Sequence, residues 1–141
     1  MKLVAALLVS LIASPALAET WEVKMYNRNE HGSMIYEPEY LKIAPGDSVK
    51  FVKSHPGHNA ATIDGMIPEG AEPFKSKINE EDFTISLPVE GSYAIKCSPH
   101  YGMGMVMLIE VGENAPAPVF EADMPKRARD RFEKIIAENR P

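Results

Sequence analysis

The chain has 141 residues, of which 15 are lysine or arginine and 20 are aspartate or glutamate, so its formal net charge is −5 at pH 7. This acidic balance excludes general affinity for nucleic acid and for anionic membranes, because both require positive charge. The sequence contains one cysteine, Cys97, which excludes an intramolecular disulfide.

The N-terminal segment has the three parts of a secretory signal peptide. Lys2 gives a positive start, residues 3–13 form an apolar run, and Ala16-Leu17-Ala18 offers small residues for cleavage. The apolar run is eleven residues long, whereas a membrane-spanning helix needs about 20. We therefore expect residues 1–18 to be removed after export, by cleavage after Ala18, and no membrane insertion afterwards.

The mature chain, residues 19–141, has the size of a single compact domain. Loss of Lys2 leaves 14 basic and 20 acidic residues and a formal net charge of −6. Short segments rich in β-branched and aromatic residues recur along this chain, separated by Gly, Pro, Asn and Asp. The predicted strands cover residues 20–26, 40–43, 48–53, 60–63, 83–87, 92–96 and 106–111. Such a series of short strands predicts an all-β, two-sheet sandwich.

The C-terminal tail has a different character from the rest of the chain. Between Lys126 and Asn139, apolar residues recur at helical spacing among charges, which predicts an amphipathic helix. A shorter helix is predicted over residues 119–124, ending near Pro125. We expect this helical tail, residues 119–139, to lay an apolar stripe on the sandwich. The stripe consists of Ala128, Phe132, Ile135 and Ile136.

A nine-residue segment that begins at Cys97, between the last two predicted strands, concentrates thiolate, imidazole and thioether donors. Cys97 and His100 are followed by Met103, Met105 and Met107, and soft or borderline ligands of these kinds are the ones that copper prefers. Met105 is the candidate axial ligand because it lies at the end of the loop rather than inside the strand. An inert buried thiol is the first alternative. A structural zinc site is the second, but it requires more thiolates or histidines.

A second imidazole has to come from upstream in the chain. His58 lies 39 residues before Cys97 and directly after Gly57, which permits close approach of the backbone to a metal. His55 lies only three residues earlier, so spacing alone leaves both histidines open; we favour His58 and a surface role for His55. His31 is expected to be a solvated loop residue. Two histidines and a cysteine with a weak axial methionine form the blue-copper arrangement used in electron transfer.

These residues carry a resemblance to a known family. The whole mature chain, residues 19–141, resembles the pseudoazurins, which are small periplasmic blue copper proteins of the cupredoxin fold. The resemblance implies a monomeric Greek-key sandwich with two C-terminal helices, and it implies that His58, Cys97, His100 and Met105 bind one copper ion. It rests on the segments 57–59, 65–68, 70–72, 74–79, 96–97 and 99–105.

The resemblance also implies roles for residues around the ligands. Asn59 and Ser98 would hydrogen-bond across the two ligand loops and so hold the site rigid. Met34 would pack near His100, the ligand through which the electron leaves. That histidine would be exposed within an apolar patch that includes Pro99.

Lysines around such a patch meet acidic partners in this family, and Lys75, Lys77 and Lys96 stand at matching positions. A positive rim on an acidic protein would steer docking. The rim is expected to be thin, because Asp64 and the pair His55-Pro56 occupy places where the family commonly has lysines. The partner that the resemblance implies is a periplasmic nitrite reductase of a denitrification chain.

Two other classes of function are alternatives to an electron carrier: an enzyme and a copper carrier. A copper oxidase or a nitrite reductase would need a second copper site with additional histidines, and only His31 and His55 are left to build it. A copper carrier without a redox partner would favour an exposed site of methionines or paired cysteines. The sequence therefore predicts a protein that is not an enzyme and that carries electrons on copper.

Overall fold

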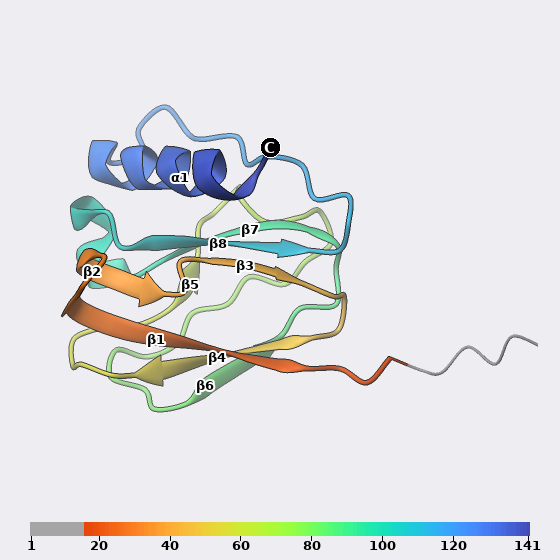
Figure 1. Ribbon diagram of the computed structural model, residues 1–141, viewed down its shortest axis with the longest axis horizontal. Helices are drawn as coiled ribbons and strands as arrows, with labels where there is room; N and C mark the ends of the chain where they lie inside the picture. Colours follow the sequence, from red (N-terminus) through yellow and green to blue (C-terminus); the bar gives the residue numbers. More distant parts are fainter. Residues whose placement is uncertain (1–15) are drawn as a thin grey trace, which may run out of the picture.

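A computed structural model describes residues 16–141 of the chain (Figure 1). Most of the expected signal peptide, residues 1–15, lies outside the described residues, and cleavage after Ala18 stays a prediction. A membrane crossing would need a longer and more apolar helix than any found in residues 16–141. The elements are β1 (Thr20–Asn29), β2 (Gly32–Glu37), β3 (Tyr40–Ile43), β4 (Ser48–Lys53), β5 (Ala61–Thr62), β6 (Phe83–Ser86), β7 (Gly91–Lys96), the 3-10 segment η1 (Ser98–Met103), β8 (Val106–Val111) and α1 (Lys126–Asn139).

The strands form two four-stranded sheets, with orders β2-β1-β4-β6 and β3-β8-β7-β5. Both sheets are mixed, since β1 pairs parallel with β4 and β3 pairs parallel with β8, while the other pairs are antiparallel. In β1 and β4 the alternation of residue types turns Val23, Met25, Val49 and Phe51 inward, where they are buried. The predicted all-β, two-sheet sandwich is therefore confirmed.

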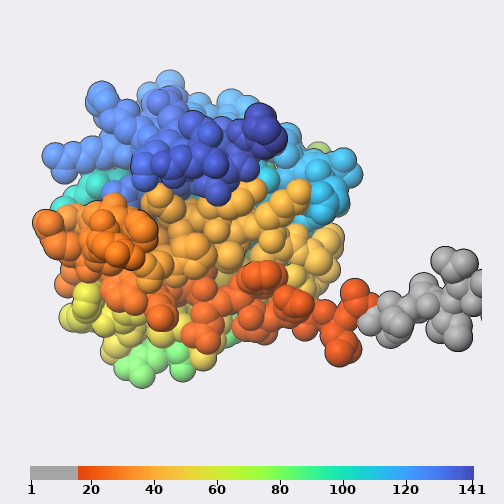
Figure 2. Space-filling view, viewed as in Figure 1, coloured from red at the N-terminus to blue at the C-terminus, as the bar shows by residue number. Residues whose placement is uncertain are grey.

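One core fills the space between the two sheets, and a second lies between β8 and α1. All six residues of β8 are buried, because one face of the strand packs into the sandwich and the other lies under the helix. Figure 2 shows the C-terminal residues, in blue, covering one side of the molecule. The helical stripe was predicted correctly: Ala128, Phe132 and Ile135 are fully buried, and Ile136 packs beside them.

One sequence prediction about the fold was wrong, and one strand was missed. The second C-terminal helix, expected over residues 119–124, is not formed, and that segment contains a single turn in which Met124 N–H donates to the Glu121 carbonyl oxygen at 3.2 Å. Six residues between Pro118 and Pro125 are too few to sustain a helix whose first turn is costly to form. The strand β2 was missed, because it begins directly after His31, which was expected to lie in a solvated loop.

Candidate metal centre

The predicted donors meet at one end of the sandwich because β4, β7 and β8 all begin or end there. His58 lies in the connection after β4, Cys97 directly follows β7, and Met105 directly precedes β8. The loop between them is closed by its own backbone, since Cys97 N–H donates to Met105 O at 3.0 Å and Met105 N–H donates to His100 O at 3.1 Å. Gly104, with φ of 86°, makes the reversal in this loop.

Three donor atoms form a compact triangle. Cys97 Sγ lies 3.7 Å from His58 Nδ1 and 3.6 Å from His100 Nδ1, and the two Nδ1 atoms are 3.2 Å apart. The centre of such a triangle is about 2 Å from each corner, which matches the bonds of about 2.0–2.3 Å from a first-row metal ion to imidazole and thiolate. Three donors of the types that suit copper are therefore placed at bonding distance from one point.

The upstream histidine of this triangle is His58, as favoured from the sequence, and His55 is not part of it. Gly57 has φ of 93°, a left-handed conformation that glycine adopts readily. A Cβ at this position would lie 3.8 Å from Cε1 of the His100 ring, so the backbone of Gly57 lies close to His100. His31 lies exposed at the turn between β1 and β2, which agrees with the prediction of a solvated residue. The structure thus resolves the ambiguity that spacing left open.

Burial sets the electrostatics of the donors. His58, Cys97 and Met105 have no exposed surface, whereas His100 is half-buried. Burial, helped by the positive charges that His100 and His55 can carry, lowers the pKa of His58 to about 4, so this ligand is a neutral imidazole at physiological pH. Burial also raises the pKa of the Cys97 thiol above its ordinary value. Since a metal binds the thiolate, binding must displace the proton of Cys97.

A side chain that sequence reasoning missed fixes the orientation of His58. The Nε2 atom of His58 lies 2.7 Å from Oδ1 of Asn27, near the end of β1. An amide oxygen only accepts, so His58 donates from Nε2 and its Nδ1 lone pair points at the other donors. The sequence gives no signal for this contact, because Asn27 is 31 residues away and lies beyond the predicted end of its strand.

The two loops that carry the donors are tied together by Asn59 and Ser98. Ser98 N–H donates to Asn59 Oδ1 at 2.7 Å, and Asn59 Nδ2 donates to Ser98 Oγ at 3.2 Å. The same Nδ2 donates to the Ser76 carbonyl oxygen at 3.1 Å. Since Asn59 is fully buried, these bonds replace those that its amide would make with water, and they fix the loop that carries His58 against the loop that carries Cys97.

Comparison with known proteins agrees with a copper site. A family model for copper binding proteins of the plastocyanin/azurin family matches residues 23–112. Pseudoazurin of Paracoccus pantotrophus is 45% identical over 130 residues, which cover 90% of this chain and 88% of that protein. A putative pseudoazurin of Rhizobium leguminosarum bv. viciae is 44% identical over 94% of this chain and 89% of its own length.

The chain belongs to the pseudoazurin family. Solved structures agree, since a pseudoazurin from Sinorhizobium superimposes with a TM-score of 0.81 at 43% identity, over 86% of this chain and 97% of the other. The refined crystal structure of pseudoazurin from Methylobacterium extorquens AM1 gives a TM-score of 0.71 at 37% identity, over 82% and 98% of the two chains. In this copper-binding family, His58, Cys97, His100 and Met105 form the ligand set of type 1 copper.

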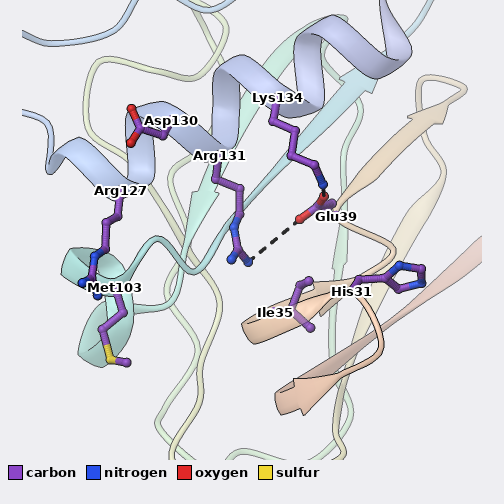
Figure 3. A pocket seen from close by; sticks show the side chains of 8 residues that line it. All are labelled: His31, Ile35, Glu39, Met103, Arg127, Asp130, Arg131 and Lys134. Carbon is purple, nitrogen blue, oxygen red and sulfur yellow. Dashed lines mark ion pairs between the residues drawn. The ribbon is translucent and has the colours of Figure 1, made fainter.

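The C-terminal helix α1 contacts the strand side of the molecule through Arg131, whose side chain points toward Glu39 in Figure 3. From α1 the guanidinium donates to the Met34 carbonyl oxygen at 3.0 Å and to the Ser33 carbonyl oxygen at 3.3 Å, and its ion pair with Glu39 spans 4.0 Å. Met34 has a left-handed backbone, with φ of 52°, and packs against the core that contains the ligands. The helix therefore holds the first residues of β2 in place.

The residues expected at a docking face are exposed to different degrees. Pro99, Lys75 and Lys77 are exposed, and Met103 of η1 is 44% exposed. Lys96 is half-buried, with its Nζ 5.1 Å from the centre of the Tyr101 ring. The apolar and cationic side chains predicted from the family are thus available at the surface, and their use in docking stays a prediction.

Proposed function

We propose that this protein is a periplasmic electron carrier of 123 residues, formed by removal of residues 1–18, and that residues 19–141 fold as one domain. One copper ion would be held by His58, Cys97, His100 and Met105. When bound, copper supplies one-electron chemistry by alternating between Cu(I) and Cu(II). The observation that carries the proposal is the triangle of donors with sides of 3.2, 3.6 and 3.7 Å in a member of the pseudoazurin family.

Burial of the donors favours a carrier over an enzyme. His58, Cys97 and Met105 offer no surface to a substrate, so a small molecule could approach the site only past His100. Asn27 holds the ring of His58, and Asn59 holds the two ligand loops together. Ligands fixed by such contacts change position little when the charge of the ion changes, which suits rapid transfer of an electron.

His100 is the proposed exit for the electron, because it is the histidine of the site that reaches the surface. Pro99 and Met103 are exposed beside it in the same loop and would form the apolar contact with a partner. Lys75, Lys77 and Lys96 would attract an acidic rim on that partner, although the whole protein is acidic. The acceptor we propose, from the resemblance to pseudoazurins, is a periplasmic nitrite reductase.

A visible spectrum after addition of Cu(II) tests the proposal. The wild-type protein should develop an intense thiolate-to-copper charge-transfer band, and the variant Cys97→Ser should lack it. A colourless wild-type complex would refute the copper site. Stopped-flow mixing then tests the function: the reduced protein should stay reduced with nitrite alone and should be oxidised when a nitrite reductase is added. Reoxidation by nitrite alone would indicate an enzyme, and no transfer to any reductase would indicate a copper carrier.

A further inference from the structure

His55 was expected to be a surface residue, but the structure connects it to His58 through one residue, Asn27. The Nδ1 atom of His55 accepts a hydrogen bond from the backbone N–H of Asn27 at 2.9 Å. The side chain of the same Asn27 bonds to Nε2 of His58 at 2.7 Å. His55 thus contacts the backbone of the residue whose side chain orients His58.

The position of Asn27 explains why its backbone needs such a partner. The pairing of β1 with β2 passes from Tyr26–Ile35 to Arg28–Ser33, and the residue opposite Asn27 is Met34, whose left-handed backbone interrupts the ladder. On its other side, the pairing of β1 with β4 ends at Met25. The N–H of Asn27 points to the β4 side, beyond the last β1–β4 pair, and there it donates to the side chain of His55 instead of to a strand partner.

His55 is itself well fixed for this task. Its backbone N–H donates to the Met25 carbonyl oxygen at 3.1 Å. This hydrogen bond lies directly beyond the last pair of β1 and β4, which is Met25–Lys53. Its ring packs edge-on against Tyr26, with the ring centres 5.4 Å apart. The ring is half-buried and presents Nδ1 to Asn27. An acceptor held by a backbone bond and an aromatic contact can define the position of the group that it binds.

We propose that His55 is a positioning residue for the copper centre. By accepting the N–H of Asn27 it fixes the backbone of that residue, and the Asn27 amide oxygen then holds the ring of His58 with Nδ1 toward the metal position. The inference rests on the proposed copper function, and it requires the neutral form of His55 with its proton on Nε2, since an imidazolium cannot accept. The partners of ligating histidines commonly change metal affinity by about 10–100-fold when they are removed.

Two substitutions separate the hydrogen bond from the packing of the ring. His55→Phe keeps an aromatic ring against Tyr26 but has no acceptor, whereas His55→Asn loses the ring but places Oδ1 the same number of bonds from Cα as Nδ1. Copper affinity should fall by about tenfold in His55→Phe and stay near the wild-type value in His55→Asn. All variants are measured at the same pH, so that a difference in affinity reports the contact made by residue 55. The exposed His31→Asn serves as the control and should change nothing.

NMR spectroscopy measures the predicted hydrogen bonds themselves, which a purely structural role of His55 would leave unchanged. Nitrogen-15 NMR spectra of the copper-free protein should show His55 with its proton on Nε2. In His55→Phe the signal of the Asn27 backbone amide should shift. In the same variant, His58 should populate both tautomers instead of only the one with its proton on Nε2. Equal affinities for all variants, or equal losses in His55→Phe and His55→Asn, would overturn the inference. Failure of the proposed function looks different, because it would leave the wild-type protein without a charge-transfer band.

Discussion

Replacing Asn59 with alanine should lower the free energy of unfolding by about 3 kcal/mol, because three hydrogen bonds of about 1 kcal/mol each are lost from a fully buried side chain. Two of them join Asn59 to Ser98 and the third reaches the Ser76 carbonyl oxygen. The backbone carbonyl of Asn59, which accepts from the Tyr36 hydroxyl at 2.6 Å, is retained by alanine. Ser98→Ala is the matched control, since it removes only the bond to Oγ and should cost about 1 kcal/mol.

Urea unfolding of the copper-free proteins, followed by circular dichroism, measures both values. With a denaturant dependence of about 2 kcal/mol per molar urea, Asn59→Ala should lower the midpoint by about 1.5 M and Ser98→Ala by about 0.5 M. The same order should appear in the rate of copper loss to a chelator, because Asn59 connects the loop of His58 to the loop of Cys97. Equal midpoints for the two variants would refute the view that the bond from Ser98 N–H to Asn59 holds the loops together.

Two further predictions concern charge. Between about pH 7 and 8, copper affinity should rise about tenfold per pH unit with release of one proton, because Cys97 keeps its proton there while His58, with a pKa of about 4, has none to lose. Calorimetry in buffers of different ionisation enthalpy measures that proton, and a flat profile would contradict the assignment. Arg140→Ala should cost about 3 kcal/mol, since it removes the cation that lies 2.8 Å from one oxygen of buried Glu110, while the other oxygen keeps its hydrogen bond from the Tyr40 hydroxyl. Urea unfolding checks this, and the double variant with Glu110→Gln should recover most of the loss.

The sequence predicted the strands whose inward faces are regularly apolar. The bounds of 40–43, 48–53 and 106–111 agree with β3, β4 and β8, because alternation or continuous apolar residues mark a strand that is buried on one face or on both. Strand β2 was missed because Gly32 and Ser33 carry no such signal. Sheet order could not be predicted either, since the parallel pairing of β1 with β4 depends on how distant segments pack rather than on local pattern.

For the site, the chemical types of the ligands were readable because three donors lie within one short loop. The choice of His58 over His55 was supported only by Gly57 and by family resemblance, and geometry was needed to resolve it. The role of Asn27 could not be predicted at all. Its contact with His58 joins the end of one strand to a loop 31 residues away, and no spacing rule relates the two.

The contacts that fix each donor come from different parts of the fold. Cys97 is held by the β7–β8 pairing and by Met105, whereas His58 is held by Asn27 at the end of β1. Because β1 belongs to one sheet and β7 and β8 to the other, the distance between thiolate and imidazole depends on how the two sheets pack as well as on the bonds between Asn59 and Ser98. A change in that packing would displace one ligand from another. The rigidity that a copper electron carrier requires is therefore a property of the whole sandwich, and His55 adds to it where the pairing of β1 with β4 has ended.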